Sequence, residues 1–184
     1  FGMGVGAYPK AFLWNNLAEN VPATFFLKQE NNKAYLQLGS GAPLYIEQTI
    51  SITANTNYQF SMDYRTDSNN IPLNISVCEK AIQHSFNCRG TGLAPNEIHT
   101  NWQHFEQSIA TQGLGDTSRP IKLILHNSHA DSSIDIKNIS LRSVEKENLL
   151  KNGDFSKGMD HWFFTTDDHI PWRAENLWVQ ILFD

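Results

Sequence analysis

Several aromatic and charged residues fall on strand-like segments of this sequence, out of phase with the apolar residues around them. Alternate residues of a strand point to opposite faces, so these side chains are expected on an outer face. A flat aromatic ring there can lie against the apolar face of a sugar ring, while carboxylates and amides bond its hydroxyl groups. The candidate binding residues are Tyr35, Tyr45, Glu47, Asp63, Arg65 and Trp102, with Asn74 and Gln103 as further residues of the same face.

The sequence contains few of the residue groupings that catalysis or metal binding requires. Glu47 and Asp63 would face each other if their segments pair, but one pair of strands does not make the cleft that glycoside hydrolysis requires. The histidine-containing stretches 126–131 and 167–169 fall in expected turns and lack metal-ligand spacing. Ser, His and Asp do not occur together in a nucleophile-elbow context. We therefore predict a binding protein and not an enzyme.

The composition is that of one domain, or of one domain with an appendage. The chain has 184 residues, of which 40% are hydrophobic, which is enough for a sizeable core. Its formal net charge is -5 and no cluster of Lys and Arg stands out, which argues against a nucleic-acid surface. No stretch reaches the roughly 20 apolar residues of a membrane span. Because the chain begins FGMGVG without an initiator Met, we expect a fragment of a longer protein.

The stretch 44–65 has the clearest periodicity in the chain. Apolar residues occupy the even positions of both 44–52 and 57–65, with Gln48 as an exception. A period of two predicts strands with one buried face and one outer face. The two runs are separated only by Thr, Ala, Asn and Thr, so we expect them to pair as a hairpin.

The same alternation recurs along the chain between turns rich in Asn, Gly, Pro and Ser. In the last such segment the apolar phase changes near Asn138, which predicts a β-bulge. The irregular stretch 89–101 is expected to cross between sheets, and it or the tail would cover Tyr35 and Tyr45 in a purely structural interpretation. We predict an all-β fold, an antiparallel β-sandwich of the jelly-roll type with short helical segments at both ends. Further strands are expected at 23–29, 33–38, 71–78, 102–110, 119–127 and 133–143.

The two ends of the chain differ from its middle. Residues 1–18 form an apolar lead-in that contains a short expected helix, with Pro9 at its first turn. Residues 19–145 hold the predicted sandwich. Residues 146–184 form a tail that is expected to complete the sandwich and to end in an amphipathic helix, or alternatively in a strand.

The two cysteines, Cys78 and Cys88, lie on neighbouring strand-like segments. A disulfide that closes a loop of this size adds about 3 kcal/mol of stability in the chain-entropy model. The alternative is two free thiols, while a zinc site lacks a second Cys/His pair with ligand spacing. We predict the disulfide, together with an extracytoplasmic location.

Three segments resemble parts of carbohydrate-binding modules of the jelly-roll, galactose-binding-like type. NLLKNGDFSKGMDHW (148–162) is similar to their opening, SSIDIKNISLRS (132–143) to their closing strand, and 45–65 to an internal hairpin. The resemblance covers roughly residues 20–165 and implies a non-catalytic domain that binds an oligo- or polysaccharide. Here the opening motif follows the closing strand, so either a truncated second module starts near Leu149 or the tail returns to the first one. We favour the second arrangement, because the tail is too short for another sandwich.

The same resemblance implies a structural calcium ion between the opening turn and the closing strand. The matching positions are Asp154 and Asp135, and carboxylate oxygens suit calcium. The family's acidic residue after NGDF is replaced here by Ser156. In the alternative interpretation Asp154 forms a local Asx-type turn and Asp135 is solvated.

The end DDHIPWRAENLWVQILFD (167–184) resembles the segment that re-enters the membrane in proteins of the O-antigen ligase/polymerase type. On that resemblance, GMGVGAYP would be the matching exit and the domain would be a periplasmic loop of a membrane protein of surface polysaccharide handling. The alternative is that both ends pack on the sandwich. For the whole domain, the alternative function is a structural or protein-interaction sandwich without a glycan site.

Overall fold

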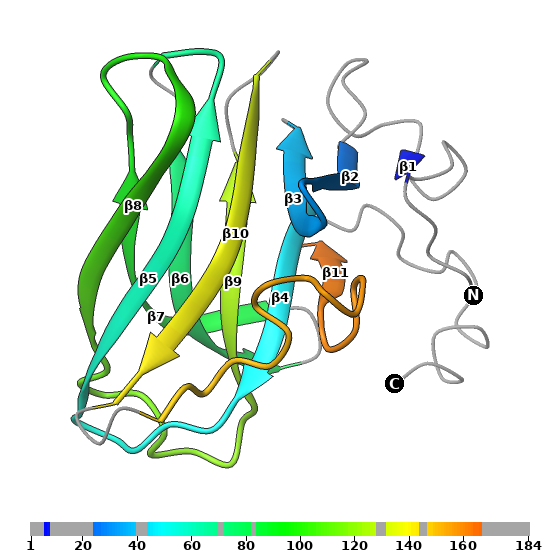
Figure 1. Cartoon of the computed structure of the whole chain (residues 1–184). Helices are drawn as coiled ribbons and strands as arrows, with labels where there is room; N and C mark the ends of the chain where they lie inside the picture. Colours follow the sequence, from blue (N-terminus) through cyan, green and yellow to red (C-terminus); the bar gives the residue numbers. More distant parts are fainter. Residues whose placement is uncertain are drawn as a thin grey trace, which may run out of the picture.

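The computed structural model describes residues 6–7, 24–39, 44–69, 72–81, 84–127, 132–143 and 147–166. The regular secondary structure in these ranges consists of β-strands, and the strands form two sheets that pack face to face (Figure 1). The predicted all-β sandwich is therefore confirmed. The strands are β1 (Gly6–Ala7), β2 (Thr24–Glu30), β3 (Lys33–Gly39), β4 (Leu44–Ile50), β5 (Asn57–Thr66), β6 (Leu73–Ala81), β7 (His84–Leu93), β8 (His99–Ala110), β9 (Ile121–Asn127), β10 (Ser133–Arg142) and β11 (Phe163–Thr166).

The two sheets have a jelly-roll-like connectivity. Sheet A has the strand order β1-β2-β3-β10-β5-β8, and sheet B has the order β11-β4-β9-β6-β7. All pairings between neighbouring strands are antiparallel. From β3 onward the chain changes sheet after every strand except β6, which pairs directly with β7. This alternation brings sequence-distant strands side by side, as in double-sheet jelly rolls.

The hydrophobic core lies between the sheets and is built from one face of each. In sheet A, β5 contributes Phe60, Met62 and Tyr64 at alternate positions, and all three are buried. In sheet B, β9 contributes Leu123 and Leu125 in the same way. Burial of this apolar surface is the main driving force for folding, and it sets which side of each strand faces out.

The prediction that the two runs of 44–65 pair as a hairpin is wrong. β4 pairs with β9 and β11 in sheet B, whereas β5 pairs with β10 and β8 in sheet A. The apolar face of each strand is buried against the other sheet, so the alternation is satisfied without any pairing between them. Residues 51–56 therefore cross from one sheet to the other and do not form a hairpin turn.

The predicted link 89–101 is also corrected. It does lead from one sheet to the other, but its first part belongs to β7 and its last part to β8. Only residues 94–98 lie outside strands. The sequence pattern concealed β7 because Cys88, Arg89, Gly90 and Gly92 interrupt any alternation of apolar and polar residues.

The segment that follows β10 packs on the sandwich. Phe155 and Trp162 are buried in the core, and β11 adds an edge strand to sheet B beside β4. Gln48, the polar exception in the β4 pattern, accounts for part of this docking. Its side-chain Nε2 donates to the Lys151 carbonyl (2.9 Å) and its Oε1 accepts from the Lys151 backbone N–H (2.7 Å).

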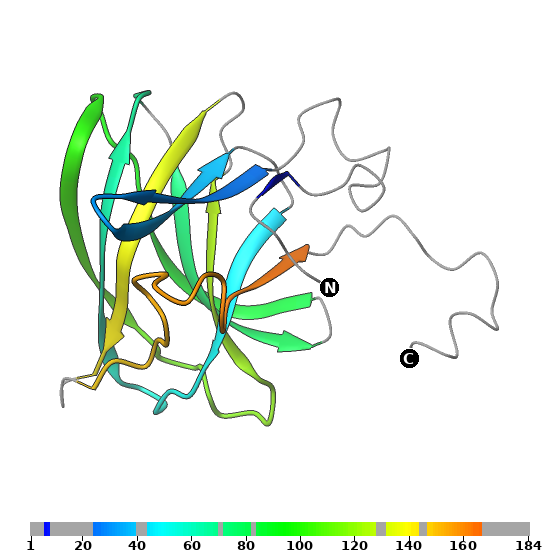
Figure 2. The same ribbon diagram turned by 45° about the vertical axis from the view of Figure 1, so that its right-hand side comes forward.

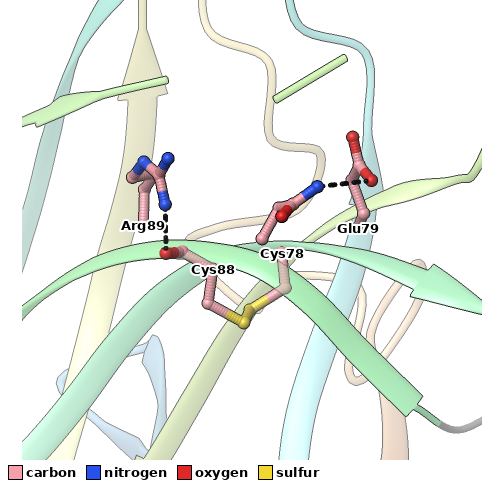
Figure 3. The surroundings of a disulfide bond; sticks show 5 residues. Cys78, Glu79, Cys88 and Arg89 are labelled. Atoms are coloured by element: carbon pink, nitrogen blue, oxygen red, sulfur yellow. Dashed lines mark hydrogen bonds between the residues drawn. A yellow bond between two sulfur atoms is a disulfide. The ribbon is translucent and has the colours of Figure 1, made fainter. Parts of the chain in front are cut away.

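Two local predictions are confirmed. The pairing of β10 with β5 shifts register between Lys137 and Ser140, and Asn138 has a φ of 52°, which marks the expected bulge. Cys78 and Cys88 form a disulfide between β6 and β7 (Figure 3). The two predicted terminal helices lie outside the described residues. Within the described part of the chain, no helix is long and apolar enough to cross a membrane.

Candidate functional site

The six predicted binding residues lie on two different faces of the molecule. Tyr35, Asp63, Arg65 and Trp102 belong to the strands of sheet A, whereas Tyr45 and Glu47 belong to β4 in sheet B. The expectation that they share one face, and that Glu47 faces Asp63, is therefore wrong. The alternation of apolar and polar residues correctly predicts that each of these side chains points to an outer face. It does not predict which of the two sheets the strand joins.

On sheet A, Arg65 is the centre of a group of contacts that joins five strands. Its guanidinium donates to Asp135 Oδ2 on β10 (2.8 Å) and to both carboxylate oxygens of Glu30 at the end of β2 (3.0 and 3.1 Å). The guanidinium carbon also lies 4.9 Å from the ring centroid of Tyr35 and 4.6 Å from that of Trp102. These are favourable cation–π distances.

Trp102 completes this group from β8. Its indole Nε1 donates to Glu30 Oε2 (3.1 Å), and the Lys137 ammonium nitrogen lies 3.6 Å from the ring centroid. The β2–β3 hairpin, which carries Glu30 at its tip, extends across β10 in Figure 2. Contacts among Glu30, Arg65, Trp102 and Asp135 therefore join the tip of this hairpin to β5, β8 and β10, and we call these four residues the hairpin latch.

The electrostatics of the hairpin latch follow from these contacts. The hydrogen bond from Trp102, followed by that from Arg65, lowers the pKa of Glu30. Burial opposes the charged form of Arg65, but its hydrogen bonds to Asp135 and Glu30 outweigh burial and raise its pKa above the ordinary value. Burial lowers the pKa of Lys137, which has two cations near it. The latch is thus an internally satisfied group of charges.

This geometry corrects the expected role of Tyr35. The ring was expected to be exposed, yet only 8% of Tyr35 is accessible to solvent, because Arg65 and the edge of Trp102 cover it. Asp63 is likewise engaged within sheet A, with His104 Nδ1 2.8 Å from its Oδ1 and the Asn138 amide donating to its Oδ2 (2.6 Å). The outer face of sheet A therefore has contacts that suit a structural role.

Replacing Arg65 by methionine is expected to lower the free energy of unfolding by about 2 kcal/mol. This is below the 3–5 kcal/mol typical of breaking a buried pair, because the side chain of Arg65 is 20% and that of Glu30 44% exposed. Because the pKa of Glu30 is lowered on folding, the contribution of Glu30 to the latch is fully present above the ordinary pKa of 4.5 and is lost as the pH falls through the folded value. Urea unfolding at several pH values measures both effects.

The matched control for this prediction is Lys33→Met, which removes a cation from an exposed site on the same hairpin. We expect it to change the free energy of unfolding by less than about 0.5 kcal/mol. Equal effects of the two substitutions would contradict the hairpin latch.

The outer face of sheet B has a different character. Cross-strand pairing places Phe163, Glu47, Ile124, Ser76 and Gly90 in one row that crosses the sheet from β11 to β7. Side chains opposite each other on neighbouring strands share a face and lie in contact distance. The row therefore combines an aromatic ring, a carboxylate and small residues along a single line.

Glu47 is the chemically distinctive residue of this face. Only 2% of the residue is accessible, and its Oε1 forms an ion pair with the Lys122 ammonium group on β9. The second oxygen, Oε2, is buried and accepts no hydrogen bond from the described residues. A carboxylate oxygen in this position is costly to leave without a donor, so a hydroxyl or N–H group placed there would be held firmly.

Aromatic rings lie on the same face as the Glu47 carboxylate. The Tyr45 ring packs against that of His126 on β9, with centroids 4.3 Å apart and planes tilted by 40°, and Phe163, directly opposite Glu47 on β11, is 55% exposed. The sequence interpretation assigned His126 to a turn and did not consider Lys122 or Phe163. A hint was available for Lys122, which alternates with the core residues of β9, but its partner Glu47 lies 75 positions away.

Toward β7, the same face carries small residues and the Cys78–Cys88 disulfide. Gly90 and Gly92 alternate on β7 and pair with Ser76 and Asn74 of β6. The fold requires glycine at position 90, because a Cβ there would lie 2.5 Å from the Ile75 carbonyl oxygen. The result is a low surface that carries one hydroxyl and one exposed amide.

The two residues expected to bind calcium make contacts with other side chains and backbone groups. Asp135 is paired with the Arg65 guanidinium and also accepts from the Gln37 amide (2.9 Å), while Asp154 accepts from the Ser156 backbone and hydroxyl groups. Those Ser156 hydrogen bonds lower the pKa of Asp154. In the described ranges, no three His, Cys, Asp or Glu side chains are grouped so that they could hold a metal ion.

Comparison with solved structures identifies the same architecture elsewhere. A carbohydrate-binding module of the CBM4 type aligns with a TM-score of 0.51 and 12% identity, over 72% of this chain and 83% of its own. The ligand-free carbohydrate-binding module of PbXyn10C gives 0.48 and 13%, over 85% and 90%, and a family 16 carbohydrate-binding module gives 0.41 and 14%, over 59% and 75%. No family model and no curated protein matches the chain. The first alignment shows that this chain is similar in fold to a carbohydrate-binding module.

Proposed function

We propose that this domain binds a saccharide, without catalysis, on the outer face of sheet B. The observation that carries the proposal is the buried Glu47 Oε2 atom, which lacks a hydrogen-bond donor among the described residues. A sugar hydroxyl group is a hydrogen-bond donor, and hydrogen bonds to a charged acceptor are among the stronger ones. Because the Oε2 atom is buried, the ligand must displace the side chains that cover it.

The surroundings of Glu47 support the same ligand class. Tyr45 and Phe163 supply aromatic surface for the C–H faces of a pyranose ring, and Asn74 supplies an amide for its hydroxyl groups. The similarity in fold to a carbohydrate-binding module is consistent with this function but does not by itself assign it. On sheet A, by contrast, the corresponding aromatic and charged groups already bond one another.

The test is a screen of the purified domain against a glycan array and, by affinity gel electrophoresis, against plant and bacterial surface polysaccharides. We expect saturable binding that Glu47→Gln weakens about tenfold or more, because the ligand's hydroxyl group loses a charged acceptor. Tyr45→Ala should weaken binding as well, through loss of stacking area.

The matched control is Asp63→Asn, which makes the same acid-to-amide change on the outer face of sheet A. It should leave binding unchanged. If Asp63→Asn abolishes binding and Glu47→Gln does not, the site is on the other sheet. If a folded domain binds nothing in either screen, the structural or protein-interaction alternative is favoured.

The proposal extends to an extracytoplasmic location. The Cys78–Cys88 disulfide supports it, because such bonds persist in oxidising compartments. A parent membrane protein of surface polysaccharide handling is supported by the sequence resemblance of 167–184, which lies outside the described residues. Mass-spectrometric detection of the oxidised cysteine pair in native cells, after alkylation of free thiols, tests the location.

A further inference from the structure

The glycines of β7 differ in what the fold demands of them. At Gly90 an added Cβ would lie 2.5 Å from the Ile75 carbonyl oxygen and 2.9 Å from the Ser76 hydroxyl, so the fold excludes a side chain there. At Gly92 the nearest atom to an added Cβ is the Leu73 carbonyl oxygen at 3.8 Å, an ordinary van der Waals contact. Gly92 also has no positive φ. Packing and backbone geometry therefore permit a side chain at Gly92, although glycine weakens a strand interior.

Gly92 lies on the same face as the proposed site. It pairs with Asn74 on β6, Asn74 pairs with His126 on β9, and the His126 ring packs against that of Tyr45 on β4. β7 is the last strand of sheet B in the described residues, so Gly92 is at the end of this line. Three strand spacings separate β4 from β7, which corresponds to about 14 Å. This distance exceeds the size of one sugar ring.

We propose that Gly92 determines how long a saccharide chain the domain can bind. Without a side chain at this position, the β7 end of the row from Tyr45 to Gly92 stays open to further sugar residues. The inference rests on the proposed function. A glycine inside a strand is often found where a ligand approaches the backbone closely, and here that backbone is exposed. The ligand class is then an extended oligosaccharide or polysaccharide that contacts the face from the Tyr45–His126 ring pair to Gly92.

The test compares wild type with Gly92→Val, using size-fractionated fragments of whichever polysaccharide is retained in the affinity gel. We expect the valine side chain to weaken binding of the longest fragments about tenfold and to leave the shortest binding fragment unaffected. The urea midpoint of Gly92→Val should be no lower than that of wild type, since the site has room for the side chain. Ser108→Val, an exposed position on β8 in sheet A, is the control and should change neither property.

A second variant tests the structural half of the argument. Gly90→Ala should lower the urea midpoint, because its Cβ meets backbone atoms, whereas Gly92→Ala should not. Equal affinity of wild type and Gly92→Val for long fragments would overturn the inference and leave the proposed function intact. Failure of the wild-type domain to bind any saccharide would overturn both.

Discussion

Replacing Trp162 by alanine is expected to lower the free energy of unfolding by about 4 kcal/mol. Trp162 is 1% exposed, its ring centroid lies 5.7 Å from that of Phe155, and its indole Nε1 donates to the Asn152 carbonyl (3.0 Å). Truncation leaves a large cavity in the core and also removes the donor from a backbone carbonyl. Urea unfolding followed by circular dichroism measures the loss.

The effect should extend to the whole segment that follows β10. Asn152 also bonds the Gly158 and Asp160 carbonyls (3.0 and 2.9 Å) and accepts from the Lys157 N–H (3.0 Å), so the turn is organised around one amide. Because the ring of Trp162 is part of the core between both sheets, we expect a single cooperative transition at a lower urea concentration. The milder Trp162→Phe keeps much of the apolar volume and should lose less stability.

The neighbouring residue provides the control for this prediction. Phe163 is aromatic and adjacent in sequence, but it is 55% exposed on the outer face of β11. Phe163→Ala should change the free energy of unfolding by less than about 0.5 kcal/mol. If both alanine variants have the same stability as wild type, residues 148–162 do not pack on the sandwich as described.

Reduction of the Cys78–Cys88 disulfide is expected to cost about 3 kcal/mol, mainly by releasing a constraint on the unfolded chain. The bond joins β6 to β7 beside the register shift between Val77 and Glu79. In Figure 3, Glu79 and Arg89 point away from the side of the strands that carries the disulfide. The bond therefore reinforces one side of this hairpin while polar contacts hold the other.

Those polar contacts should keep the reduced domain folded. Glu79 is fully buried, accepts from the Asn87 amide (3.2 Å) and the Gly115 N–H (3.3 Å), and lies 3.6 Å from the Arg119 guanidinium. We expect hydrogen exchange to rise in β7, which is an edge strand in the described part of sheet B, more than in β5. Sheet A should keep its protection.

Urea unfolding with and without a phosphine reductant measures the disulfide contribution. The double variant Cys78→Ala/Cys88→Ala is the control, and it should match the reduced wild type and not respond to the reductant. An unchanged midpoint after reduction, verified by thiol titration, would show that the bond contributes no stability.

Local features of this fold were predictable because they depend on neighbouring residues. The period of two in β4 and β5 separated core side chains from outer ones, and the phase change near Asn138 located a bulge. Cys78 and Cys88 are close in sequence, so their disulfide could also be predicted from the sequence. Strand β7 was not predicted, because a strand rich in glycine does not show the alternation of apolar and polar residues by which strands are recognised.

The candidate site depended on contacts between distant parts of the chain. Alternation states that Tyr35 and Tyr45 both point outward, but the sheet that each strand joins is decided by pairing with β10 and β9, roughly 80 to 100 residues later. The ion pair of Glu47 likewise depends on Lys122, which lies 75 residues later in the sequence.

The sequence by itself therefore determined the class of fold, the inward and outward faces of most strands, the bulge and the disulfide. Only the tertiary structure decided that Arg65 and Trp102 bond Glu30, and that a Glu47 oxygen lies buried without a donor among the described residues. The physical reason is that side-chain alternation is a property of each strand's backbone, whereas strand order is set by burial of all apolar faces together.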